Sequence, residues 1–177
     1  MNIFFLHDDP DQAARYYADK HVGKILIECC QMMSTSAREY GFVGGYGDTH
    51  VSHPMTLWVG ASRSHYEWCW DHAVALADEW IKRYGKAHAS MQLLPSLGLA
   101  SRLIPENGWR NPPRCIPDEY KVNYEHHAAK KRWVTGLDVS CHVASYRAYY
   151  ANDKRHLHSW TKRDKPEWLT DYIEVAA

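Results

Sequence analysis

The chain has 177 residues, of which 45% are hydrophobic and 13% aromatic, a composition that suits one folded domain and excludes a largely disordered chain. Lysine plus arginine equals aspartate plus glutamate, at 21 each, so the net charge of zero argues against strong non-specific binding to nucleic acid. Any such binding would need a local basic patch. No apolar run reaches the length of a membrane span, and we expect no membrane partner.

The cysteines and histidines give no pattern typical of a metal site or a disulfide framework. The five cysteines are irregularly spaced, and the 12 histidines show no HExxH or paired CxxC spacing. We therefore expect reduced, mostly buried thiols, no metal site and no cofactor.

The first part of the chain predicts an apolar tail followed by a long helix. Residues 2–6 form a short apolar run, and Asp9 before Pro10 is typical of a helix start, so the predicted N-terminal helix spans residues 10–38. A glycine-rich loop at 41–50 ends this helix. We expect a flexible loop rather than a phosphate-binding one, because its glycines match no phosphate-binding spacing.

A second long helical pattern occupies the centre of the chain. It begins after Ser52-His53-Pro54, has a candidate break at Gly60, and continues to Tyr84, where Gly85 is typical of a helix end. The remaining predicted elements are a weaker helix at 87–103 interrupted near Pro95, a proline-rich loop at 105–117, helices at 118–133 and 138–156 with Asp138 as N-cap, and a short helix at 167–173. With no period-two strand, the fold class is all-α: one compact multi-helix domain with a long N-terminal and a long central helix.

The predicted N-terminal helix has two faces. An apolar stripe contains Val22, Ile25, Leu26, Cys29 and Met33, and a narrow polar group beside it contains His21, Lys24, Glu28 and Gln31. Two interpretations remain open for the polar group. It is either a solvated surface with ordinary i,i+4 ion pairs, or a catalytic group at the packing boundary, where partial desolvation shifts pKa values.

The residues around this polar group resemble a known family. The segment from Ala18 to Val22, with Glu28 seven residues after His21, is similar to the first helix of the phage pyrimidine-dimer DNA glycosylases, the endonuclease V family. Further similar elements follow in the same order: Ser52-His53-Pro54, Leu57-Trp58-Val59-Gly60-Ala61, Lys82-Arg83-Tyr84-Gly85 and, most loosely, residues 163–168. The resemblance implies a compact all-α domain.

The resemblance also implies a chemistry. In that family an α-amine attacks C1′ of the damaged nucleotide, the base departs, a Schiff base forms, and a glutamate assists the proton transfers that cut the strand. Glu28 matches that glutamate. The family uncovers its amine by removing the initiator methionine from a small second residue, whereas Asn2 is larger, so the amine of Met1 and that of Lys24 both remain candidates. Ile27 and Gln31 replace two arginines that flank the family's glutamate.

These observations lead to one functional expectation and two alternatives. We expect a DNA glycosylase and AP lyase for damaged or modified pyrimidines, with DNA or a modified pyrimidine nucleotide as partner, in the cytoplasm, that of the host cell if a phage encodes it. The candidate catalytic residues are Met1, His21, Lys24 and Glu28; the substrate-binding residues are Asn2, Lys20, Gln31, His53 and Arg63; the DNA-binding residues are Arg110, Arg114, Lys154, Arg155, Lys162 and Arg163. The alternatives are a related phage enzyme of nucleobase processing or DNA hypermodification, and a non-catalytic helical binding protein. The oligomeric state stays open.

Overall fold

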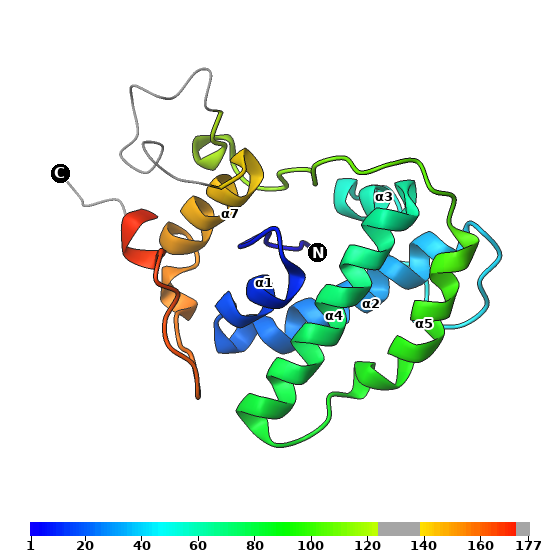
Figure 1. The fold of residues 1–177 in the computed structure, drawn as a ribbon, viewed down its shortest axis with the longest axis horizontal. Helices are drawn as coiled ribbons and strands as arrows, with labels where there is room; N and C mark the ends of the chain where they lie inside the picture. The colour runs from blue at the N-terminus through cyan, green and yellow to red at the C-terminus, as the bar shows by residue number, and fades with distance from the viewer. Residues whose placement is uncertain (124–138, 173–177) are drawn as a thin grey trace.

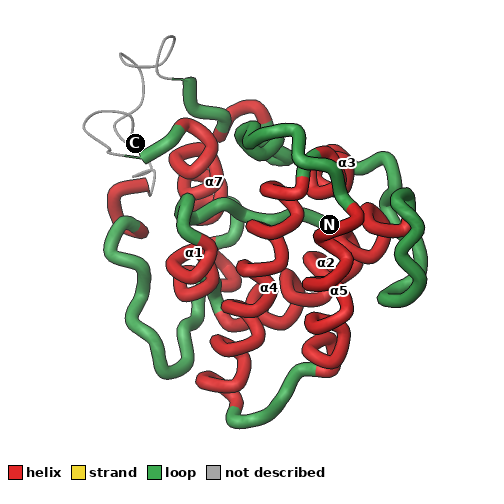
Figure 2. Tube along the Cα trace, turned by 45° about the vertical axis from the view of Figure 1, so that its right-hand side comes forward, coloured by secondary structure: helices red, strands yellow, loops and turns green. Residues whose placement is uncertain are grey.

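The computed structural model describes residues 1–123 and 139–172, and this part of the chain contains helices and loops but no strand (Figure 1; Figure 2). The α-helices are α1 (Pro10–Tyr16), α2 (Asp19–Arg38), α3 (Pro54–Ala61), α4 (Arg63–Tyr84), α5 (Leu94–Ala100) and α7 (Cys141–Asn152). Short 3-10 turns are η1 (Ala89–Leu93), η2 (Ser101–Leu103), η3 (Asp118–Tyr120), η5 (Arg155–Leu157) and η6 (Leu169–Tyr172). The predicted all-α class and its single compact body are confirmed.

Helices α2 and α4 form the centre of the bundle and pack against each other over much of their length (Figure 1). The apolar stripe predicted on α2 is buried in full. Gly23 permits the close approach of the two helices, because a Cβ built there would lie 2.5 Å from the Trp80 ring. The apolar stripe of α2 is thus part of the core, as its periodicity predicts, and further residues of the helix are buried beside it.

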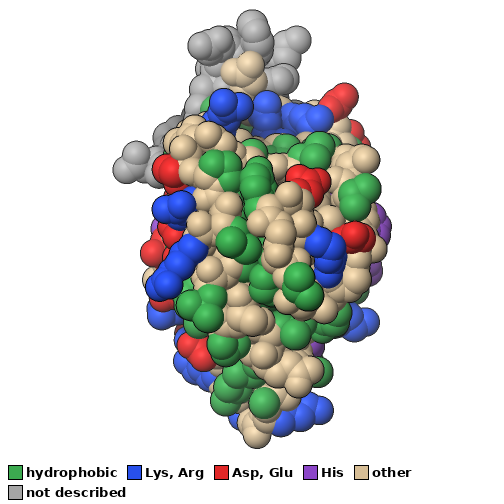
Figure 3. Space-filling model, turned by 90° about the vertical axis from the view of Figure 1, so that its right-hand side faces the viewer, with side chains coloured by type: hydrophobic (Ala, Val, Ile, Leu, Met, Phe, Trp, Pro, Cys, Tyr) green, Lys and Arg blue, Asp and Glu red, His purple; other side chains and the backbone are tan. Residues whose placement is uncertain are grey.

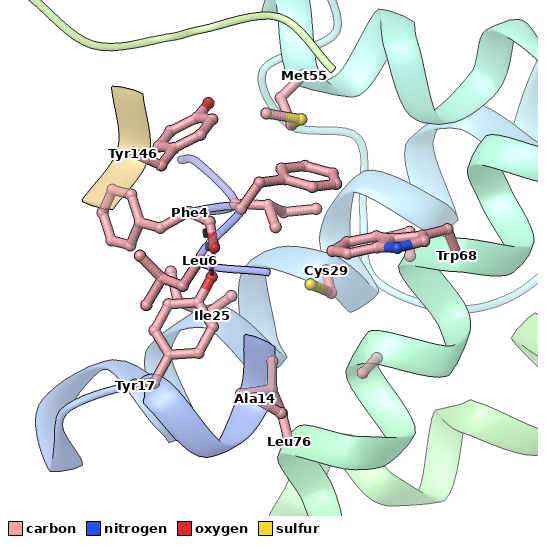
Figure 4. Close-up of a cluster of buried hydrophobic side chains, with 14 of the residues drawn as sticks. Phe4, Leu6, Ala14, Tyr17, Ile25, Cys29, Met55, Trp68, Leu76 and Tyr146 are labelled. Carbon is pink, nitrogen blue, oxygen red and sulfur yellow. Dashed lines mark hydrogen bonds between the residues drawn. The ribbon is translucent and has the colours of Figure 1, made fainter. Parts of the chain in front are cut away.

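The N-terminal segment runs through the core rather than over the surface, and the amino terminus lies among the helices (Figure 1; Figure 2). Ile3, Phe5 and Leu6 are fully buried. The backbone N–H of Phe4 donates to the Tyr17 hydroxyl at 2.9 Å, and that hydroxyl donates to the Phe4 carbonyl at 2.7 Å (Figure 4). These bonds satisfy backbone groups that neither helix nor sheet could pair at this depth.

The single helix predicted for residues 10–38 is wrong in one respect, because the chain breaks between α1 and α2. Tyr17 and Ala18 both adopt extended backbone angles. Buried Arg83 donates to the Tyr17 carbonyl at 2.7 Å, and the Ala18 N–H donates to the Tyr150 hydroxyl at 2.8 Å. Tertiary partners therefore stabilise the break where neither glycine nor proline signals it.

The helix ends follow their local signals more closely. The Asp9 side chain accepts from the Gln12 N–H at 2.8 Å and caps α1, and Gly85 adopts a left-handed conformation (φ 68°) at the end of α4. His53 caps α3. The break in the central pattern occurs at Ser62, in extended conformation, two residues after the candidate Gly60.

The C-terminal third differs most from its prediction. Residues 105–117 form the expected loop, but 118–123 contain only η3 and an extended stretch, so the helix predicted from 118 is wrong over this part. The rest of that helix, and the predicted cap Asp138, lie outside the described residues. Helix α7 begins after Ser140 and stops at Asn152, short of the predicted end at 156, and the short helix predicted at 167–173 is the 3-10 turn η6 over its described part.

All five cysteines are free thiols, and Cys29, Cys30 and Cys69 are buried, as expected. No helix in the two described ranges is long and apolar enough to cross a membrane.

Phe5 tests whether the N-terminal segment is a structural part of the core. It is fully buried and stacks on Trp68 with ring centroids 4.1 Å apart. We expect Phe5→Ala to lower the free energy of unfolding by about 3–5 kcal/mol in urea denaturation, because it removes a buried ring and leaves a cavity. Val43→Ala, at a side chain 94% exposed, should change it by less than about 0.5 kcal/mol. A loss below about 1 kcal/mol for Phe5→Ala would contradict this description.

Candidate functional site

The amino-terminal segment ends against the carboxylate of Glu28, on the side of α2 that faces the bundle. The backbone nitrogen of Asn2 donates to Glu28 Oε2 at 2.8 Å. The other oxygen, Oε1, lies 3.5 Å from Lys24 Nζ. The Glu28 side chain is only 11% exposed, whereas that of Lys24 is 62% exposed. One carboxylate thus contacts the partly buried start of the chain on one side and a solvated amine on the other.

Asn2 is held by groups from the opposite side of the fold. Its Nδ2 donates to the Cys115 carbonyl at 2.9 Å, and the Tyr146 hydroxyl lies 3.2 Å from its Oδ1. The same hydroxyl lies 2.8 Å from the Pro113 carbonyl. Burial raises the pKa of Tyr146, which therefore stays a neutral phenol. The proline-rich loop and α7 together fix the position of residue 2.

Met1 and His53 complete the surroundings of Glu28. The Met1 sulfur accepts from Thr56 Oγ1 of α3 at 3.7 Å. His53 Nδ1 accepts from the Met55 N–H at 3.1 Å, so the neutral ring carries its proton on Nε2. Burial, then the amino-terminal ammonium and His50, lower the pKa of His53, and Glu28 opposes this shift. The terminal amine, the carboxylate and the imidazole are therefore electrostatic neighbours.

His21 has a different environment from the one that its spacing suggests. Its Nδ1 lies 2.7 Å from the Tyr150 hydroxyl, its ring packs edge-on against Phe4 at 5.2 Å, and the residue is 3% exposed. Burial, followed by the charges of Lys24 and Lys154, lowers its pKa to about 4. His21 is a neutral, buried residue with no hydrogen bond to Glu28.

Several predicted DNA-binding residues make internal contacts. Arg163 forms an ion pair with Glu79, and Lys154 pairs with Asp153 at 2.7 Å while lying over the Tyr149 ring. Arg114 donates to the Val122 carbonyl at 2.5 Å. Much of the basic character that made these segments candidates is thus used within the fold.

The other predicted site residues are spread over the molecule. Arg63 donates to the Ile104 carbonyl at 3.2 Å at the start of α4, and Lys162 contacts the Lys82 carbonyl at 3.4 Å. Four others, with no side-chain hydrogen bond or ion pair in the described structure, are half-buried Gln31 and exposed Lys20, Arg110 and Arg155. The structure therefore gathers Met1, Asn2, Lys24, Glu28 and His53 around one carboxylate, and Lys20 and His21 lie with Lys24 along a neighbouring groove.

Cys115 and Tyr146 contact Asn2 but were not predicted. Each lies more than a hundred residues away in sequence, and neither belongs to a recognisable motif. Within residues 1–123 and 139–172, no three histidine, cysteine or carboxylate side chains are grouped as metal ligands. The chemistry available at Glu28 is that of an amine, a carboxylate, an imidazole and an amide.

Comparison of this chain with protein-family models, with curated proteins and with solved structures finds no match.

The burial of His21 predicts an acid-sensitive fold. A histidine that stays neutral when folded down to pH about 4, but binds a proton near pH 6.5 when unfolded, contributes stability that is present above pH 6.5 and is lost as the pH falls towards 4. The free energy of unfolding should fall by about 1.4 kcal/mol per pH unit in this window for each such histidine. His72, with its pKa also lowered by burial to about 4, adds to the effect.

NMR titration of the imidazole protons measures the pKa of His21 directly. In denaturation experiments at a series of pH values, His21→Gln should remove one histidine's share of the pH dependence of the free energy of unfolding. The exposed Val43 provides the control, since Val43→Ala changes no titratable group and should leave the dependence unchanged. A His21 resonance that titrates near the ordinary value would contradict the buried, neutral assignment.

Proposed function

We propose that this protein is a DNA glycosylase and AP lyase for damaged or modified pyrimidine nucleotides, with an amine at the amino terminus as nucleophile and Glu28 as acid and base. One observation carries the proposal: the 2.8 Å hydrogen bond from the Asn2 nitrogen to Glu28 Oε2. It places the end of the chain against a carboxylate that is almost buried. With Met1 in place this nitrogen is a peptide N–H, and the α-amine of Met1 lies one residue beyond it. An amine beside a carboxylate in a partly dry site is what this chemistry requires.

We assign the role of nucleophile to the terminal amine rather than to Lys24. If Met1 is removed, the nitrogen bound to Glu28 becomes the α-amine itself; if Met1 is retained, its amine is one residue away. An α-amine is less basic than a lysine side chain in general, so more of it is unprotonated and nucleophilic near neutral pH. Lys24, largely solvated and paired with Oε1, suits an electrostatic role beside the carboxylate.

These residues can carry out base removal and strand cleavage in successive steps. The terminal amine forms a bond to C1′ as the bond from C1′ to the base breaks, and the base leaves with a proton. Glu28 moves the second proton of the amine to the ring oxygen as the bond from C1′ to that oxygen breaks, and a Schiff base forms. Glu28 then removes a proton from C2′, the bond from C3′ to oxygen breaks, and the 3′ phosphate leaves. His53, a neutral donor through Nε2, and Asn2, fixed by Cys115 and Tyr146, suit the positioning of the sugar.

A second candidate function rests on the residues beside Glu28. Ile27 and Gln31 are uncharged where the resembling family carries arginines, so the phosphates are held by other groups or the substrate differs. A related enzyme that processes a nucleobase or hypermodified DNA keeps the same amine and carboxylate but leaves the strand uncut. A non-catalytic binding protein needs neither group.

Borohydride trapping on a duplex with an abasic site tests the first proposal. Borohydride reduces the Schiff base to a stable bond, so the wild-type protein should form a covalent adduct with the DNA. Glu28→Gln should form it at least about 100-fold more slowly, because it removes the acid and base. Glu39→Gln, an exposed residue at the end of the same helix, is the matched control and should trap at the wild-type rate.

Two outcomes would reject the lyase. One is the absence of both adduct and strand cleavage when the wild-type protein meets abasic or dimer-containing DNA. The other is equal trapping by Glu28→Gln and wild type. No adduct, combined with a nucleotide affinity that depends on Glu28, would favour the related enzyme; no dependence on Glu28 in any assay would favour the binding protein.

A further inference from the structure

A groove of about 800 Å³ lies on the outer side of α2, next to the Glu28 site. Lys20 and Lys24 of α2 line one side; Trp80 and Tyr84, from the last turns of α4, line the other; Lys86 follows them in the chain. Lys24 belongs both to this groove and to the ion pair with Glu28. Lys24 therefore connects the groove with the Glu28 site.

The groove has an excess of positive charge. Among the described residues, Asp19 is the one acidic side chain that lines it. Burial alone would raise the pKa of this carboxyl, but hydrogen bonds from Thr161, Ser159 and Arg83 outweigh burial and lower it. The carboxylate is thus occupied by groups behind the groove. In the structure described here, Lys20 and Lys86 are exposed and form no ion pair. Their charges are available to an external anion.

Further positive groups surround the same region. Leu157 brings the η5 turn to the groove's edge, and this turn carries the exposed residues Arg155 and His156. The charges of Lys154 and His156 lower the pKa of buried His21, which also lines the groove, so both side chains lie near it. A protein of zero net charge thus has a local basic patch, the condition for binding nucleic acid.

One wall of the groove is aromatic. The Trp80 and Tyr84 rings lie with centroids 4.4 Å apart, and His88 meets Trp80 edge-on at 4.8 Å. Trp80 is half-buried, and its ring is seated against Gly23. Basic residues beside aromatic rings are the combination used to bind a single nucleic-acid strand, since the cations contact phosphates and the rings contact bases.

The other large cavity of the described structure lacks this character. It measures about 480 Å³, lies against α5 and contains Glu67 and Asp71. Burial, then the charges of Glu67 and Asp11, raise the pKa of Asp71, which indicates a locally acidic environment. The face on this side of the molecule carries hydrophobic side chains over its middle (Figure 3). A cavity with two carboxylates suits a phosphate less well than the lysine-lined groove does.

We propose that the groove between α2 and the end of α4 binds the phosphodiester backbone of a single DNA strand, with Lys20 and Lys86 as phosphate contacts. The proposal rests on the proposed function only for the identity of the ligand as DNA. The strand runs past Lys24, so that one nucleotide reaches Glu28. Lys20, expected from sequence to bind substrate, thereby gains a specific role; Lys86 was not expected to have one.

Binding of a labelled oligothymidylate, followed by fluorescence anisotropy over a range of salt concentrations, tests this in the full-length protein. Each phosphate contact contributes about 0.7 to the slope of log affinity against log salt for a single strand. Lys20→Gln combined with Lys86→Gln should therefore reduce the slope by about 1.4 and weaken binding about 25-fold at about 0.1 M salt. Both residues are exposed, and circular dichroism should show an unchanged fold.

The matched control is Lys82→Gln combined with Arg102→Gln, which removes the same charge from two exposed residues outside the groove and should leave the slope unchanged. An equal loss in both double variants, or an unchanged slope in the groove variant, would overturn the proposal. Thymidine monophosphate and inorganic phosphate are tested separately. If either one binds as tightly as the oligomer, the ligand of the groove is a small anion and the proposal of a DNA strand is overturned. Because binding needs no catalysis, these results are independent of the trapping experiment.

Discussion

The passage of residues 1–6 through the helix bundle is the constraint on which the rest of the structure depends. Extended backbone at this depth is stable only because side chains satisfy its polar groups: Tyr17 bonds both backbone groups of Phe4, and Arg147 donates to the Leu6 carbonyl at 2.8 Å. The same path leads the chain to Glu28, where the Asn2 nitrogen meets the carboxylate. Core packing and the proposed reactive centre therefore depend on one segment.

The periodicity of the sequence was enough to predict the α2 stripe, the caps at Asp9 and Gly85 and the position of Glu28 near the packing boundary, because these depend on residues within a few positions of one another. The break after Tyr16 and the burial of His21 depend on Arg83 and Tyr150, which are distant in sequence. The contact of Tyr146 with Asn2 was not predicted for the same reason, since the two residues are distant in sequence. Local patterns predicted where the helices form, whereas distant partners decide which polar groups are accessible.

The distribution of cations changes how the basic segments should be interpreted. Arg163 and Arg83 are paired with buried Glu79, and Arg147 lies 4.8 Å from the Trp168 ring centre. These residues stabilise the fold, since removing one partner of a buried pair leaves an uncompensated charge. Lys20 and Lys86 have no such internal role among the described residues. A chain with no net charge thus contains both internal ion pairs and a small basic patch on its surface, beside the Glu28 site.

Peptide mapping of the borohydride-reduced adduct tests the central claim most directly, because it identifies the nitrogen that bonds to the sugar. After digestion with trypsin, the account predicts that the DNA-derived mass is carried by the N-terminal peptide that ends at Arg15, on the α-amine of Met1 or, if Met1 is removed, of Asn2. An adduct on Lys24 would show that the amine at the amino terminus is not the nucleophile, and would contradict the account that starts from the Asn2 to Glu28 hydrogen bond.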